Sequence, residues 1–374
     1  MRKEEIRGLI IYSILIIAAL IVGFTAIRPT MEDFGPAKMS PFGFLIVVLV
    51  IAYLFNAVGL EVLHVIGALF GGYKVTAFNV LGLCIYKTEE KWKFGLRDFG
   101  GISGETKIAP KKEKLNINLL TWFPIFGYAI EIGVCVVLMT IIANKDEPGA
   151  WLKSAALIFI LISSMIAFYN LVPFKLDSMT DGYRMRLFSK PVNVEAYNKM
   201  LVIQEEQRLG KNMENIPVFE EITEYTAEIN KLAMYQLLEN EKLIEAEAIL
   251  DKLLEHKQVL NVNEYNRLIA QKLYLSVMLN SVEKAKELYD QLCPIEIRRF
   301  IANDFSMPSI RAYILIAGMI EGSESEVEFA KSKIERAKKK ALASEIKAEE
   351  KLLEKAINYV YENHPKWVKE KDAE

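Results

Sequence analysis

Four long apolar runs occupy the first half of the chain, at residues 8–27, 42–70, 117–143 and 151–172. A bilayer core of about 30 Å is crossed by roughly 20 helical residues at ~1.5 Å per residue, so each run can form a transmembrane helix. The first run follows a basic start, but it is too long for a signal peptide and no clean small-residue cleavage site follows it. We therefore predict four retained membrane helices.

Residues 73–110 show a different pattern, with β-branched and aromatic residues, short alternations and a pair of glycines at 100 and 101. This pattern predicts short strands or a hairpin rather than another membrane span. We therefore expect residues 1–189 to form a membrane domain of helices with a small β element.

Residues 190–374 are rich in Glu, Lys, Leu and Ala, with apolar positions at helical spacing. The stretches 232–255 and 266–292 each predict two helices that are joined by a short polar turn. The tail from 326 to 374 predicts a charged amphipathic helix pair. The predicted fold class is therefore mainly α, with a separate soluble helical domain after the membrane domain.

The paired helices resemble tetratricopeptide-like helical hairpins, although their repeat length is irregular. The positions near the usual small and bulky residues are Ala246, Leu250, Ala285 and Tyr289. Stacked helical hairpins offer concave surfaces for peptides, so we expect this domain to bind a protein partner.

Composition and charge agree with this division. Hydrophobic residues make up 52% of the 374 residues and charged residues 25%, which fits a membrane part joined to a soluble part. Lys and Arg are frequent in residues 73–116 and after 183 but few at 28–41 and 144–150, so the positive-inside rule places both termini in the cytoplasm. The net charge of −2 gives no reason to expect nucleic acid as a partner. Three scattered cysteines predict neither a disulfide framework nor a zinc knuckle, and the Lys- and Ile-rich composition suggests a bacterial cell membrane.

Two ionisable residues, Glu61 and His64, interrupt the second apolar run. Ionisable groups at membrane depth are costly and usually functional. The five residues from Leu60 to His64 match the zinc-binding pattern HExxH except at the first position, where Leu60 replaces a histidine. In that pattern both histidines bind zinc and the glutamate is the general base, whereas a leucine side chain cannot ligate a metal.

A second motif ends the fourth run, where Asn170 and Pro173 are followed by Asp181 and Gly182. With both motifs in this order, residues 40–190 resemble the site-2 protease family of intramembrane zinc metalloproteases. Further residues after His64 follow the family pattern, namely Ala68, Gly72, Lys74, Val75 and Phe78.

The resemblance implies zinc as the cofactor, with His64 and Asp181 as ligands and Glu61 as general base. It implies that Asn170 helps to bind substrate and to stabilise the oxyanion. It also implies that the β element lies near the active site, where its edge can hold an extended peptide by backbone hydrogen bonds.

Asp177 competes with Asp181 for the ligand position, because the common family spacing falls one residue after Asp177. We favour Asp181, since Gly182 after it permits a tight turn. Glu131, in the middle of the third run, predicts a buried hydrogen-bonding group between helices, with metal ligation as the alternative.

Two functions of different classes follow from Leu60 and its neighbours. The first is a catalytically impaired pseudoprotease that binds a transmembrane or extended peptide in the groove. The second is an active zinc metalloendopeptidase with a variant metal site, supported by the joint presence of Glu61, His64 and Asp181. Packing or hydrogen bonding between helices could also explain Glu61 and His64. A transporter is a distant third function, because this chain has few intramembrane polar residues to line a path.

Overall fold

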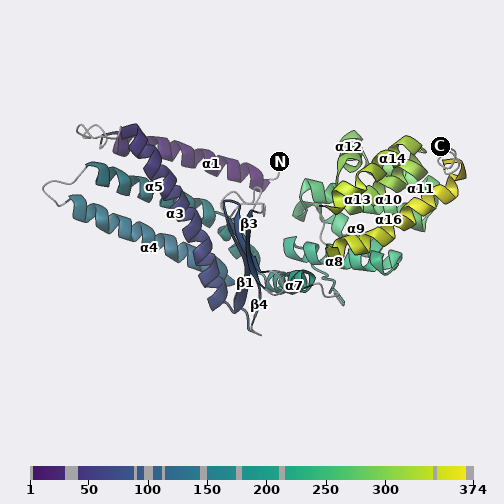
Figure 1. Cartoon of the computed structure of the whole chain (residues 1–374), viewed down its shortest axis with the longest axis horizontal. Coiled ribbons are helices and arrows are strands. Elements are labelled where there is room, and N and C mark those ends of the chain that lie inside the picture. Colours follow the sequence, from purple (N-terminus) through teal and green to yellow (C-terminus); the bar gives the residue numbers. More distant parts are fainter. Residues whose placement is uncertain are drawn as a thin grey trace. The chain divides into compact units, whose positions relative to one another are not determined.

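The computed structural model of the chain describes residues 3–29, 41–87, 91–96, 104–111, 114–143, 150–173, 179–209, 215–339 and 343–367. These residues are mainly helical, with one small antiparallel sheet (Figure 1). The chain divides into two compact units, Met1–Arg208 and Leu209–Glu374.

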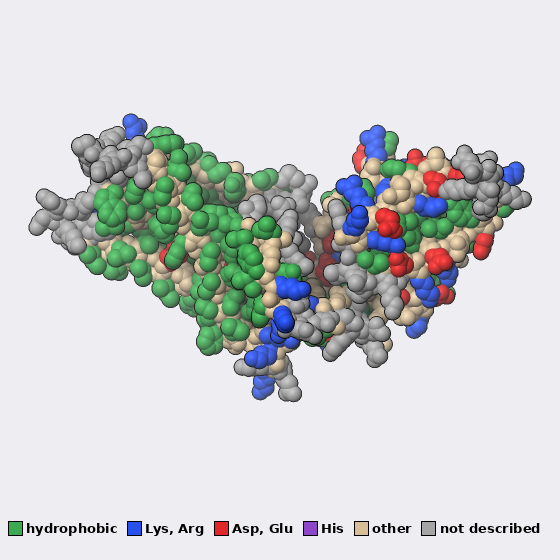
Figure 2. All heavy atoms as spheres, in the orientation of Figure 1, with side chains coloured by type: hydrophobic (Ala, Val, Ile, Leu, Met, Phe, Trp, Pro, Cys, Tyr) green, Lys and Arg blue, Asp and Glu red, His purple; other side chains and the backbone are tan. Residues whose placement is uncertain are grey.

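Four helices of the first unit are long and apolar enough to cross a membrane, at Gly8–Ile27, Phe42–Phe70, Asn118–Ile141 and Trp151–Leu171. Each lies within one of the four predicted runs, so the prediction of four such helices is confirmed. On the face that Figure 2 shows, most side chains of these helices are hydrophobic. The helices that contain them are α1 (Lys3–Val22) with the π-helical turn η1 (Gly23–Ile27), α3 (Pro41–Phe70), α4 (Asn118–Ala143) and α5 (Ala150–Leu171).

The sheet follows α3 directly and confirms the predicted β element. Its strands are β1 (Tyr73–Val80), β2 (Leu83–Lys87), β3 (Trp92–Leu96) and β4 (Gly104–Pro110), in the order β3-β2-β1-β4. All neighbouring strands pair antiparallel, and Leu81 and Gly82 form the tight turn between β1 and β2 with φ values of 52° and 82°. A bulge between Val75 and Ala77 shifts the register of β1 against β4.

The first unit ends with two helices, α6 (Asp181–Phe188) and α7 (Pro191–Arg208). The Tyr73 hydroxyl donates to Asn198 Oδ1 of α7 at 2.8 Å, and Lys74 Nζ lies 2.7 Å from Glu205 Oε1. With α7 bound to β1 in this way, the first compact unit includes α7 and ends at Arg208.

The second unit is built from helices joined by short turns. Each of the two predicted stretches forms a helix pair: α8 (Glu224–Glu239) with α9 (Leu243–Glu255), and α10 (Val262–Leu279) with α11 (Val282–Leu292). The remaining elements are η2 (Lys257–Val259), α12 (Ile295–Asn303), α13 (Met307–Leu315), η3 (Ile316–Ile320), α14 (Glu324–Ser332), α15 (Ile334–Lys338), α16 (Ala343–Asn363) and η4 (Pro365–Trp367). The tail therefore holds three helices where a pair is predicted.

An ion pair lies inside this helical unit. Arg311 of α13 is fully buried, and its Nε lies 2.9 Å from Glu349 Oε2 of α16. Its Nη2 donates to Gln271 Oε1 of α10 at 2.8 Å, and its guanidinium stacks over the ring of Tyr274. The contacts of Arg311 thereby join three helices at the centre of the unit.

Candidate functional site

Helix α3 brings the two ionisable residues of the second apolar run to one place. Glu61 and His64 stand three residues apart on one helix face and are buried, with 3% and 7% of their surfaces exposed. His64 Nδ1 lies 3.6 Å from Glu61 Oε2, too far for a hydrogen bond but close for a pair of charges. Leu60, one turn before His64, is buried as well.

Asp181 reaches the same place from the start of α6. His64 Nε2 lies 3.2 Å from both carboxylate oxygens of Asp181. A carboxylate only accepts hydrogen bonds, so Nε2 carries a proton when it bonds to Asp181 in its ionised form. Of the two predicted candidates, Asp181 thus lies at His64, while Asp177 lies outside the described residues.

Gly182 explains how α6 approaches so closely, and the reason differs from the predicted one. The residue sits inside the first turn of α6 and does not have a positive φ. A Cβ placed on it would lie 1.9 Å from the carbonyl oxygen of Leu171, at the end of α5. Thr180 caps α6 and also donates from Oγ1 to the Val172 carbonyl at 2.8 Å. The glycine is needed for contact between two helix ends rather than for a turn.

Strand β4 holds Glu61 from the other side. Thr106 Oγ1 donates to Glu61 Oε2 at 2.6 Å. A Cβ on Gly104 would lie 2.6 Å from Cγ of Glu61, so only a glycine leaves room for this side chain. Glu61 is therefore fixed by the sheet as well as by its own helix.

The fit of a zinc ion to these residues can be judged from the donors. In a tetrahedral site with bonds of about 2.0–2.1 Å, two ligand atoms lie roughly 3.3 Å apart, close to the spacing between His64 Nε2 and Asp181. The third position is a hydrocarbon at Leu60, and the closest approach of Glu61 to the ring is to Nδ1 rather than to Nε2. Among the described residues, no three His, Cys, Asp or Glu side chains form a group that could hold a metal ion. The described residues therefore do not supply three protein ligands to a zinc ion.

A second polar cluster lies among the long apolar helices. Ser163 Oγ of α5 donates to Glu131 Oε1 of α4 at 2.6 Å, and Asn56 Nδ2 of α3 lies 3.3 Å from the same oxygen. Glu131 is thus a hydrogen-bonding group between helices, as the sequence predicts. Tyr128, one turn before Glu131, is also buried. Its hydroxyl group is near enough to Glu131, Asp181 and Glu61 for their carboxylates to act on it electrostatically.

The sequence does not predict several of these partners. Thr106, Gly104 and Ser163 carry no motif, and they reach Glu61 and Glu131 only through strand register and helix packing. Asn170 is half-buried in the last turn of α5.

Glu105 adds a carboxyl group to the opposite face of β4. Burial raises its pKa, while the charges of Lys107 and Arg184 act in the opposite direction and that of Glu61 raises the pKa further. Acidic groups thus lie against both faces of β4, with Glu105 on the strand itself and Glu61 on helix α3.

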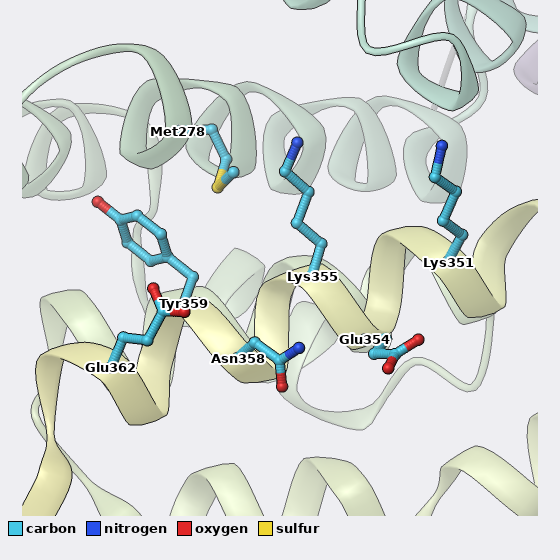
Figure 3. Close-up of a pocket in the computed structure, with 7 residues that line it drawn as sticks. All are labelled: Met278, Lys351, Glu354, Lys355, Asn358, Tyr359 and Glu362. Carbon is cyan, nitrogen blue, oxygen red and sulfur yellow. The ribbon is translucent and has the colours of Figure 1, made fainter.

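The second unit contains a pocket that is separate from the residues around His64 (Figure 3). It has a volume of about 380 Å³ and is lined by Met278 of α10 together with Lys351, Glu354, Lys355, Asn358, Tyr359 and Glu362 of α16. The two lysines lie 3.6 Å and 3.5 Å from the carboxylate of Glu241. With acidic and basic groups mixed in its lining, the pocket does not select a ligand of either charge.

No family model, curated protein or solved structure matches the chain. The geometry of the site therefore carries the functional argument.

Proposed function

We propose that this chain is a membrane protein of the site-2 protease type that lacks zinc catalysis and binds a transmembrane or extended peptide. Its tetratricopeptide-like domain then presents a surface to a protein partner. In this proposal the chain crosses the membrane four times, with both termini in the cytoplasm. The alternative is an active zinc metalloendopeptidase with a variant metal site.

The observation that carries the proposal is the buried side chain of Leu60, one helical turn before His64. Two of the three expected ligands converge, with 3.2 Å between His64 Nε2 and each oxygen of Asp181, and the third is replaced by a side chain that cannot bind metal. Glu61, which would be the general base of a protease, accepts a hydrogen bond from Thr106.

The position of β4 supports peptide binding. β4 stands at one edge of the sheet and pairs with β1 on its other side. An edge strand can take up an extended peptide by backbone hydrogen bonds, and here it would do so next to Glu61.

The alternative has one observation in its favour, which is the spacing between His64 Nε2 and Asp181. It equals, within about 0.2 Å, the spacing of two ligands on one zinc ion. This spacing would let the two side chains share one zinc ion.

Zinc content separates the two functions. Zinc per chain is measured in detergent-purified wild type, in Leu60→His and in Leu60→His combined with His64→Ala. The control is Val62→His, which adds a histidine to the exposed face of α3, where Val62 is 42% exposed. We expect about one zinc in Leu60→His alone, because only this variant completes three ligands. Stoichiometric zinc in the wild type would overturn the proposal in favour of the protease.

Peptide binding is tested separately, with a photoreactive amino acid at Lys107 in β4 and, as control, at Lys93 in β3. We expect a membrane peptide to be cross-linked from the β4 position only. Equal cross-linking from both positions, or none, would contradict binding at the β4 edge.

A further inference from the structure

The hairpin formed by β2 and β3 exposes an apolar face. Its large hydrophobic side chains are between 46% and 80% exposed, and they are Leu83, Ile85, Trp92, Phe94 and Leu96. Soluble surfaces seldom gather so many large apolar side chains in one patch, so a patch of this kind marks an interaction surface.

Strand register shows which way this face points. Phe94 pairs with Ile85, Ile85 with Phe78, and Phe78 with Thr106. Directly paired residues lie on one face of a sheet, and Thr106 bonds to Glu61 in α3. The apolar face therefore lies on the side of the sheet that meets the membrane helix.

The neighbouring row of residues gives the same answer. Leu96 pairs with Leu83, Leu83 with Val80, and Val80 with Gly104, whose Cα stands against the side chain of Glu61. Two rows thus run from exposed apolar residues of β3 to the residues of β4 that contact Glu61.

The opposite face of the hairpin has a different character. It carries Lys93 and Tyr86, and across β1 it continues to Lys107 of β4. Lys93 and Lys107 are exposed. The hairpin is thus amphipathic across the sheet, with Lys93 on the side away from α3, while Lys87 of β2, which pairs with Trp92, ends the apolar face.

The apolar surface of α3 is continuous along the chain with this face. Leu69 and Phe70 at the end of α3 are 53% and 69% exposed, and β1 starts three residues later, at Tyr73. Figure 2 shows hydrophobic side chains over the visible face of the long apolar helices.

We propose that the β2–β3 hairpin rests on the bilayer, with its apolar face among the lipid acyl chains and Trp92 near the headgroups. The partner is the lipid itself, because the face is apolar, continuous with the helices that suit a bilayer, and backed by lysines that stay in water. Tryptophan is enriched at membrane interfaces for the same reason, since its ring is both apolar and polar. This inference does not depend on the proposed function, because it holds with or without zinc or peptide.

The test uses tryptophan fluorescence in the full chain, in nanodiscs of brominated phosphatidylcholine. The chain has four tryptophans, and Trp122→Phe, Trp151→Phe and Trp367→Phe leave Trp92 as the only reporter. A second reporter is Phe94→Trp and the matched control is Tyr86→Trp, each made with all four native tryptophans replaced by phenylalanine.

We expect Trp92 and the reporter at position 94 to be quenched by bromine to a similar extent as Trp122 of α4 when that is kept alone. We expect the reporter at position 86 to be quenched several-fold less. Equal quenching at positions 94 and 86 would overturn the proposal. Weak quenching at 94 with blue-shifted emission would also overturn it, because a protein partner or a second copy would then cover the face.

Discussion

Replacing Gly182 by alanine tests whether the site depends on the close contact between α5 and α6. The added Cβ would lie 1.9 Å from the Leu171 carbonyl oxygen, whereas real Cβ contacts essentially never fall below 3.0 Å. One of the two helix ends must therefore move by at least about 1 Å. Such overpacking costs ~1–3 kcal/mol, and the movement also strains the hydrogen bond from Thr180 to Val172, worth ~0.5–1.5 kcal/mol.

We expect Gly182→Ala to lower the free energy of unfolding in detergent by about 2–4 kcal/mol. The assay is unfolding by a denaturing detergent, followed by circular dichroism. The matched control is Gly133→Ala in α4, where nothing lies within 4 Å of an added Cβ. This control should leave the stability unchanged or raise it by up to ~1 kcal/mol, because alanine is the better helix former.

The reasoning is refuted if Gly182→Ala unfolds with the same free energy as Gly133→Ala. The residue would then tolerate a side chain, and the approach of Asp181 to His64 would not depend on a glycine. A loss of stability in both variants would instead point to the effect of any added methyl group in this fold.

Three further predictions concern ionisable side chains and their partners. Glu349→Ala leaves Arg311 buried without its partner and should cost ~3–5 kcal/mol in chemical unfolding, whereas Arg311→Met with Glu349→Leu should stay near the wild type. Burial opposes ionisation of Asp304, but hydrogen bonds and the charge of Arg267 hold its pKa at about 2. This folded pKa lies below the unfolded value of about 4. The ionised Asp304 therefore stabilises the fold fully above about pH 4, and this stabilisation is lost as the pH falls through about 2. Asp304→Asn should remove this part of the pH dependence of the free energy of unfolding. Glu131→Leu removes the acceptor of two polar side chains between membrane helices and should cost ~1–3 kcal/mol in detergent unfolding, while Glu131→Gln should cost less.

Much of the fold could be predicted from the sequence, because the signals are long and local. An apolar run of 20 or more residues, or a helical period with a polar turn, is read from neighbours along the chain. The boundary between the two units has no such local signal in the sequence. It depends on contacts such as that of Tyr73 with Asn198, and these join residues more than a hundred positions apart.

The candidate site could be predicted in part. Glu61, His64 and Asp181 carry motifs, and the structure brings all three together. Thr106 could not be found in this way, since its place beside Glu61 depends on a bulge in β1 that shifts the register. The predicted reason for Gly182, a tight turn, is wrong. The sequence alone does not distinguish a glycine that is needed for a turn from one that is needed for close contact between two helices.

The contacts of α7 with the sheet give the site a mechanical connection. Besides the bonds from β1, Arg208 Nη1 donates to the Lys87 carbonyl oxygen at the end of β2. Backbone hydrogen bonds join these strands to β4, where Thr106 holds Glu61. Tension applied to the chain at Arg208, the last residue of the first unit, is therefore carried through the sheet to the side chain at the centre of the site.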